Sequence, residues 1–318
     1  MLQTTSEMRS GVSRPLRIER RRLAGAIVRL ASLLLLAGCT GGVLDPKGPV
    51  GVGNSTLMLD SLAIMLAIVV PTIIATIAFA WWFRASNAKA HRLPDWEFSG
   101  PIEIVVWAIP LLTIILLGGV AWIGSYAFDP FKPVEGQGKP LEVQVVSLDW
   151  KWLFIYPEQG VASVNELAVP AGRPLHFTLT SSSVMNAFFV PQLGSMIYTM
   201  NGMATQLWLR ADLTGEYLGL SSHYSGEGFP DMRFTVKVMA PEQFDAWVGR
   251  AHAATARLDN AAYSQLARQS LKDRVSMFGG VDGGLFERVV RGELPPGPGP
   301  GTDDHGTRAA PQISMKGH

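Results

Sequence analysis

The residues that most suggest chemistry lie in one short stretch, residues 221–232, which reads SSHYSGEGFPDM. Its spacing resembles a loop built around a metal ion. His223 could pair with Met232 as a copper ligand there, but two such ligands make a weak site. The chain has one cysteine, Cys39, far from this loop, so a site with two thiolates cannot form. The stretch therefore predicts a loop that keeps the length of a ligand loop and lacks its ligands.

The single cysteine ends a predicted signal sequence. A start rich in arginine leads into LASLLLLAGC, a short apolar run that ends in small residues. Such a run is typical of a secretory signal and is too short to cross a bilayer. The box LAGC, residues 36–39, resembles the cleavage box of bacterial lipoproteins, which implies removal of residues 1–38 and a lipid on Cys39. An uncleaved anchor is the alternative.

Charge and hydropathy limit the class of protein. The net charge is +1, but residues 1–38 hold seven arginines and two glutamates, a local +5, so the remaining chain carries −4. A mildly acidic body lacks the basic patch of a nucleic-acid-binding protein, so we expect no nucleic acid partner. A mean hydropathy of +0.19 with 17% charged residues indicates membrane segments.

Two uncharged apolar runs predict those segments. They cover residues 61–83 and 104–126, and each is long enough to cross about 30 Å of hydrocarbon as a helix. Tryptophans lie near their ends, as residues of the membrane interface do. We therefore predict transmembrane helices at 61–83 and 103–126, the second one including Glu103 at its start.

Positive charge predicts the orientation of the two spans. The connecting loop, residues 84–102, carries Arg84, Lys89 and Arg92, whereas residues 39–60 carry only Lys47. The excess of positive charge marks the loop as cytoplasmic, so both flanks lie outside. A lipidated Cys39 must also lie outside, which agrees with this assignment.

The segment after the second span is typical of an all-β domain. Residues 135–240 follow the proline-rich link DPFKPVEGQGKP and alternate short runs such as EVQVVSLDWKWLFIYP with turn residues. About eight strands in ~105 residues favour an antiparallel sandwich. Residues 241–292 become alanine-rich and predict a helical region. Residues 293–318 are so rich in proline and glycine that we expect disorder.

Two spans followed by an outer β sandwich resemble subunit II of the haem-copper respiratory oxidases, from residue 39 to about 291. The resemblance implies a cupredoxin-like Greek-key sandwich. In the cytochrome c oxidase branch this sandwich holds a dinuclear copper centre, with an early His and then Cys, a Glu carbonyl, Cys, His and Met. The corresponding positions in this sequence are Asn186, Ser221, His223, Ser225, Phe229 and Met232.

Only Met232 matches that ligand pattern. Copper of this kind needs soft thiolate, which a serine hydroxyl cannot replace, so we expect no metal on this chain. The pattern resembles the quinol oxidase branch, of the cytochrome bo type. Other long stretches resemble this branch as well: VLDPKGPVG, FAWWFRASN, SLDWKWLFIYPEQGVASVNE and SSVMNAFFVPQLGSMIYTMNGM.

This resemblance implies a specific role. The chain would be subunit II of a proton-pumping quinol oxidase that reduces O2 to water, in a bacterial inner membrane. Its mature N-terminus and its sandwich would be periplasmic. It would carry no catalytic residue and no cofactor, since the haems and copper belong to subunit I. Its partners would be subunit I, the other oxidase subunits and membrane lipid, with quinol reached through the complex.

One acidic residue has two interpretations. Glu103 begins the second span, where the helix dipole favours an acid. The resemblance implies a further role, since a Glu at this place lies at the mouth of a proton-uptake path into subunit I. An acid at a membrane boundary that faces a partner is a candidate proton relay.

Two alternative functions stay open from the sequence. One is a membrane-tethered periplasmic copper-binding protein or chaperone, because thioethers bind Cu(I) and five methionines cluster in one half of the sandwich. Methionine also fills gaps in cores and interfaces, which is the simpler explanation. The other alternative is subunit II of a cytochrome c oxidase with a degraded copper site. The five methionines are Met185, Met196, Met200, Met203 and Met232.

Overall fold

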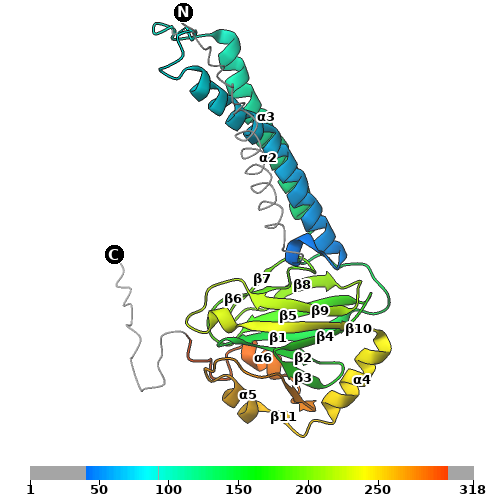
Figure 1. Cartoon of the computed structure of the whole chain (residues 1–318). Coiled ribbons are helices and arrows are strands. Elements are labelled where there is room, and N and C mark those ends of the chain that lie inside the picture. Colours follow the sequence, from blue (N-terminus) through cyan, green and yellow to red (C-terminus); the bar gives the residue numbers. More distant parts are fainter. Residues whose placement is uncertain (1–40, 92, 300–318) are drawn as a thin grey trace, which may run out of the picture. The chain divides into compact units, whose positions relative to one another are not determined.

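The computed structural model describes residues 41–91 and 93–299. The predicted signal sequence and Cys39 lie outside the described residues, as do residues 300–318. Within the described part, two long apolar helices precede a β-sandwich domain, and short helices follow it (Figure 1). The predicted combination of two spans and a sandwich is therefore confirmed.

The two long helices are α2 (Pro49–Trp82) and α3 (Gly100–Ala127), and both are long and apolar enough to cross a membrane. At 1.5 Å per residue, the 34 residues of α2 extend about 51 Å, well beyond a hydrocarbon layer of about 30 Å. Helix α2 accordingly begins at Pro49, before the apolar run that starts at Ser61. Its first turns precede that apolar run and contact the sandwich.

Glycines let the two helices approach closely near the sandwich. A Cβ added at Gly53 of α2 would lie 2.0 Å from the ring of Phe128, which directly follows α3. A Cβ added at Gly124 of α3 would lie 2.5 Å from the Leu57 side chain. A larger residue at either position would push the helices apart, because such contacts are far inside van der Waals distance.

The backbone at the start of α2 is joined to the sandwich. The Lys47 amide donates to the Gln192 carbonyl at 2.7 Å, and the Lys47 carbonyl accepts from the Asp212 amide at 2.8 Å. A Cβ added at Gly48 would lie 1.9 Å from the Arg210 carbonyl oxygen. Only glycine fits so close to another backbone. The helix pair is thus attached to the sandwich by main-chain contacts rather than through a free linker.

The sandwich consists of two sheets. The first has the strand order β12-β3-β2-β1-β5-β8 and the second β4-β10-β9-β6-β7 (Figure 1). A small third sheet pairs β11 with β13. The strands of the first sheet are β1 (Leu141–Leu148), β2 (Lys151–Tyr156), β3 (Val161–Val164), β5 (Pro174–Ser181), β8 (Thr205–Arg210) and β12 (Ser276–Phe278). Those of the second are β4 (Glu166–Pro170), β6 (Asn186–Phe189), β7 (Ile197–Thr199), β9 (Gly215–Ser221) and β10 (Arg233–Met239). The third sheet contains β11 (Arg257–Leu258) and β13 (Gly280–Val281).

Strand pairing corrects one detail of the predicted antiparallel sandwich. Strand β1 runs parallel to β5, with Val145 opposite Leu179, and β10 runs parallel to β4. The other pairs of the two large sheets are antiparallel. Parallel neighbours need a long connection between them. Sequence alternation marks the strands but not their partners, so it could not predict these pairs.

Aromatic side chains fill the core between the sheets. Trp152 and Phe154 of β2 meet Phe188 of β6 and Phe234 of β10, and all four are buried. The centroids of the Phe188 and Phe234 rings lie 5.2 Å apart, and those of Phe154 and Phe234 lie 5.1 Å apart. Such ring pairs add specific contacts to the burial of apolar area.

The C-terminal region packs on the sandwich with more than helices. It contains α4 (Pro241–His252), α5 (Asn260–Leu266) and α6 (Leu285–Val290), and its strand β12 adds to the edge of the first sheet beside β3. Residues 293–299, which the composition assigned to a disordered tail, also contact the domain. The Gly297 amide donates to the Ser182 hydroxyl at 3.1 Å, and the Gly299 amide to Asp149 Oδ2 at 2.8 Å. Glycine and proline content alone could not predict these contacts.

A buried lysine fastens the C-terminal region. Lys151 of β2 is only 2% exposed, and its ammonium lies 2.8 Å from Asp273 Oδ2 and 2.9 Å from the Arg268 carbonyl. It also donates to the Ser270 hydroxyl. Burial disfavours the charged form of Asp273, but Lys151 and Ser270 outweigh that effect and hold the pKa of its carboxyl below the usual value. The buried ammonium of Lys151 therefore has three oxygen partners in the C-terminal region.

We expect Asp273→Asn to loosen the C-terminal region. The substitution leaves the Lys151 ammonium buried without a counter-ion, which costs about 3 kcal/mol. The matched control is Asp282→Asn in the same region, whose partner Arg257 has a side chain 67% exposed. The free energy of unfolding of this control variant should fall by less than about 1 kcal/mol. Denaturant unfolding of the full chain in detergent measures both; equal losses would contradict a structural role for this ion pair.

The same pair predicts a pH dependence. Because the pKa of Asp273 is lowered in the folded chain, its contribution is present above about pH 4 and is lost as the pH falls through the folded pKa. The stability difference between wild type and Asp273→Asn should therefore shrink below about pH 4. A difference that stays constant down to pH 2 would contradict the assignment.

Candidate functional site

The predicted ligand positions lie at the ends of neighbouring strands of the second sheet. Ser221 ends β9, Asn186 begins β6, and these strands are adjacent. The loop after β9 runs through a short 3-10 helix, η2 (Phe229–Asp231), to Met232 at the start of β10. The order β10-β9-β6 thus brings residues from two separate stretches of sequence to one end of the sandwich.

Two of these positions are joined by a hydrogen bond. The Ser221 hydroxyl lies 3.1 Å from Asn186 Oδ1 and 3.2 Å from the His223 carbonyl oxygen. It also accepts from the Ala187 amide at 3.5 Å. Ser221 and Asn186 are both buried, so their polar atoms need partners inside the protein. The hydroxyl at the first thiolate position therefore links strands β6 and β9.

The second thiolate position makes a similar local contact. The Ser225 hydroxyl donates to Met232 Sδ at 3.8 Å, and both residues are buried. Trp150 holds this loop from the opposite sheet, because its indole N–H donates to the Ser225 carbonyl at 2.9 Å. A Cβ added at Gly228 would lie 2.3 Å from the Trp150 ring, so the loop lies flat on the indole.

The rings at two of the six positions have other neighbours. The His223 ring packs edge-on against Tyr198, with centroids 5.8 Å apart, and the Phe229 ring packs on Tyr224 at 5.6 Å. The backbone of His223 still joins the group, because its carbonyl accepts from the Ser221 hydroxyl. The structure therefore brings Asn186, Ser221, Ser225 and Met232 into one hydrogen-bonded loop region and directs the two rings to other neighbours.

The chemistry of this donor set does not suit a copper centre. It offers an amide, two hydroxyls and a thioether, all neutral, where a dinuclear copper site needs bridging thiolates. Across residues 41–91 and 93–299, no group of three or more His, Cys, Asp or Glu side chains could hold a metal ion. The polar groups of the loop pair with one another instead.

The methionines do not form one cluster. Met232 is buried in the core, whereas Met185, Met196 and Met203 are exposed on the surface. The thioether of Met196 accepts from the Ser222 hydroxyl at 2.7 Å. Met232 therefore does not belong to one surface set with Met185, Met196 and Met203.

Glu103 lies in the first turn of α3, as predicted, and its side chain is exposed. The indole N–H of Trp107 donates to Glu103 Oε2 at 3.1 Å. The two residues are four apart on the helix, so their side chains share one face. We had not singled out Trp107; the spacing of four residues was the available signal.

Trp150 packs against the core, as expected of an aromatic residue in LDWKW. It does not continue a strand, because Asp149 and Trp150 form the turn between β1 and β2. Trp150 has a φ of 63°, a left-handed conformation that is rare for a bulky residue. Burial of its ring against the loop stabilises this conformation, and an alternating pattern gives no sign of it.

Comparison with known proteins places the chain in a family. A family model described as COX Aromatic Rich Motif matches residues 252–292. Ubiquinol oxidase subunit 2 of Acetobacter aceti is 49% identical, over 82% of this chain and 85% of that protein. Cytochrome bo(3) ubiquinol oxidase subunit 2 of Pseudomonas aeruginosa is 46% identical, over 82% of this chain and 79% of that protein.

A solved structure is similar at a greater distance. The periplasmic domain of cytochrome oxidase subunit II from Bradyrhizobium japonicum is 24% identical, covers 37% of this chain and 94% of that one, and has a TM-score of 0.34. The full-length relatives carry the assignment instead, because their identity extends over both spans and the sandwich. The chain belongs to the family of ubiquinol oxidase subunit 2.

Proposed function

We propose that this chain is subunit II of a proton-pumping quinol oxidase and that it contributes structure rather than a redox centre of its own. The observation that supports this most is the loop at residues 221–232, whose former ligand positions pair through hydrogen bonds such as Ser221 with Asn186. The names of its relatives, which are ubiquinol oxidase subunits, support the choice of quinol as electron donor.

Quinol as the donor explains why copper is unnecessary here. A donor dissolved in the membrane reaches the complex from within the bilayer, so electrons need no relay through an outer domain. In this proposal the haems, the copper and the quinol-oxidising residues belong to subunit I. This chain packs its two spans on subunit I and covers the outer face of that subunit with the sandwich, which is periplasmic in a bacterial inner membrane.

The first prediction concerns copper. We expect the full chain, purified in detergent and incubated with Cu(I) or Cu(II), to retain no stoichiometric copper after gel filtration, because its donor set has no thiolate. The matched positive control restores the ligands through Asn186→His, Ser221→Cys, Ser225→Cys and Phe229→His. Two tightly bound coppers on the wild type would contradict the proposal, and one Cu(I) lost on Met196→Leu would favour the chaperone function.

We propose further that Glu103 is the entrance of a proton-uptake path into subunit I. Two features support this: the carboxylate sits at the cytoplasmic end of α3, and most of its surroundings are open for a partner. Trp107, which hydrogen-bonds to it, is 72% exposed, so a partner that covers this helix face contacts both residues.

The test is Glu103→Gln in the whole oxidase complex. The amide keeps the size and the hydrogen bond from Trp107 but cannot release a proton, so turnover and proton uptake should both fall several-fold. Asp60→Asn, an exposed acid on α2, is the matched control and should leave both rates unchanged. Wild-type rates in Glu103→Gln would refute the relay and leave the helix dipole as the reason for this acid.

The lipid anchor is a separate proposal, since Cys39 lies outside the described residues. Its support is the cleavage box LAGC after a basic and apolar start. Cys39→Ala should yield an unprocessed chain of higher mass without lipid. Because α2 and α3 remain, the variant should stay in the membrane fraction. Mass spectrometry and fractionation measure this; an unchanged mass would contradict processing, and a soluble variant would contradict the spans.

A further inference from the structure

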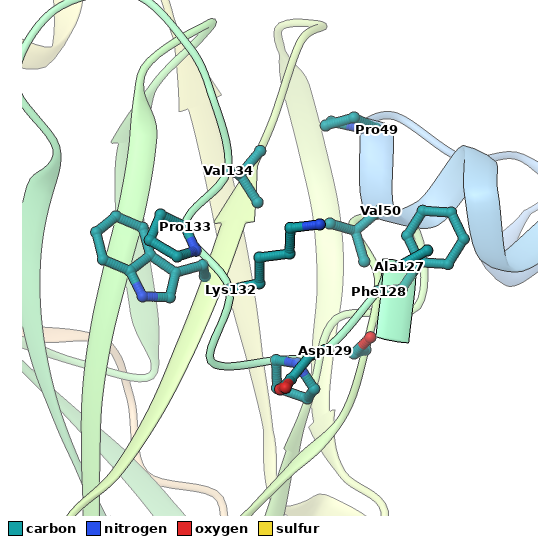
Figure 2. A pocket seen from close by; sticks show the side chains of 11 residues that line it. Pro49, Val50, Ala127, Phe128, Asp129, Lys132, Pro133 and Val134 are labelled. Carbon is teal, nitrogen blue, oxygen red and sulfur yellow. The ribbon is translucent and has the colours of Figure 1, made fainter. Parts of the chain in front are cut away.

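A small cavity lies where the outer ends of the two helices meet the sandwich. Its volume is about 180 Å³, and Figure 2 shows the Lys132 side chain extending into it. The first residues of helix α2 and the last residue of α3 line this cavity. The proline-rich link that follows α3 lines it as well. The lining residues are Pro49, Val50, Ala127, Phe128, Asp129, Pro130, Lys132, Pro133, Val134, Ser195 and Trp208.

The residues at the outer ends of the two helices indicate where this cavity lies relative to the membrane. The rings of Trp122 and Tyr126 on α3 lie 5.1 Å apart and are exposed, as aromatic residues at the level of lipid headgroups are. Ala127, the next residue, already lines the cavity. On α2, the one charged residue is Asp60, and the uncharged run begins directly after it. Leu57 of α2 packs against Gly124 of α3. In the orientation of the proposed function, the cavity therefore lies at the outer membrane interface.

The cavity walls carry two opposite charges that do not pair with each other. Within residues 41–91 and 93–299, the Lys132 side chain forms no ion pair and no hydrogen bond. Asp129 Oδ1 accepts from the Phe131 amide at 2.9 Å, which fixes its carboxylate at the cavity rim. The remaining walls are largely apolar and include Phe128 and Trp208. A ligand of matching chemistry carries both a negative and a positive charge.

The cavity size limits how much of a ligand enters. Sites for drug-sized molecules measure roughly 300–1,000 Å³, so about 180 Å³ admits only the polar end of a larger molecule. The rest of that molecule would lie on the exposed apolar surface of α3, which includes Ile123 and Tyr126. A small polar end with a long apolar remainder describes a membrane lipid.

We infer that this cavity binds the headgroup of a zwitterionic phospholipid with a primary ammonium, that is, phosphatidylethanolamine. Lys132 pairs with the phosphate and Asp129 with the ammonium, and the acyl chains follow α3 into the bilayer. A quinol ring would fit by size, but it is neutral and would gain nothing from Lys132 and Asp129, which are both exposed to water. The inference rests on the membrane orientation of the proposed function and not on the electron donor.

The test measures lipid retained by the purified complex. Complexes of wild type, Lys132→Gln and the control Lys139→Gln are delipidated by detergent exchange, and bound lipid is counted by native mass spectrometry. Lys139 belongs to the same link, pairs with Glu158 and does not line the cavity. We expect Lys132→Gln to lose a tightly held phosphatidylethanolamine, with retention falling about tenfold, and Lys139→Gln to keep it.

A second variant tests the ammonium. Asp129→Asn keeps an acceptor for the Phe131 amide but removes the charge. In nanodiscs of mixed composition it should lose its preference for phosphatidylethanolamine over phosphatidylglycerol, while the wild type keeps that preference. Equal lipid retention by wild type and Lys132→Gln, or retained quinone in place of lipid, would overturn the inference. Turnover and copper content are separate readouts. A negative result in the lipid experiments can therefore be told apart from a failure of the proposed function.

Discussion

The joint between α2 and the sandwich is the constraint on which the rest of the structure depends. Main-chain hydrogen bonds at Lys47 and the close approach of Gly48 to the Arg210 carbonyl attach the helix without any intervening side chain. A flexible linker would let the domain reorient freely. Here the contact between backbones fixes the first turn of α2, and with it the close packing of Gly53 on Phe128. The lining of the cavity follows from the same joint, since Pro49 and Val50 belong to it.

The loop at residues 221–232 has a structural explanation that needs no metal. The Ser221 hydroxyl joins β6 to β9, and Trp150 fixes the loop through the Ser225 carbonyl. Buried hydroxyl and amide groups must be paired, and these contacts pair them within the domain. Trp150 also packs beneath Gly228, which fixes the course of the loop.

The sequence predicted those features that local patterns encode. Uncharged runs predicted both spans, and alternating β-rich segments predicted a sandwich, because hydrophobic periodicity follows from which face is buried. Features that depend on distant partners were not predictable. The turn at Trp150 is stabilised by Gly228, the Lys151 ammonium is matched by Asp273, and the parallel pairing of β1 with β5 spans several intervening segments. Each of these features depends on a residue far along the chain, and a single sequence does not show which distant residues pair.

Helix α3 connects the two places where this subunit could influence the oxidase. Its first turn carries Glu103, and its last residue, Ala127, lines the outer cavity. At 1.5 Å per residue, the 24 residue steps from Glu103 to Ala127 separate these places by about 36 Å, enough to span a hydrocarbon layer of about 30 Å. Pro110 lies inside the helix, where a carbonyl left without its usual donor can adapt to a neighbour. If both proposals hold, this one helix links proton entry at its first turn with lipid contact at its last residue.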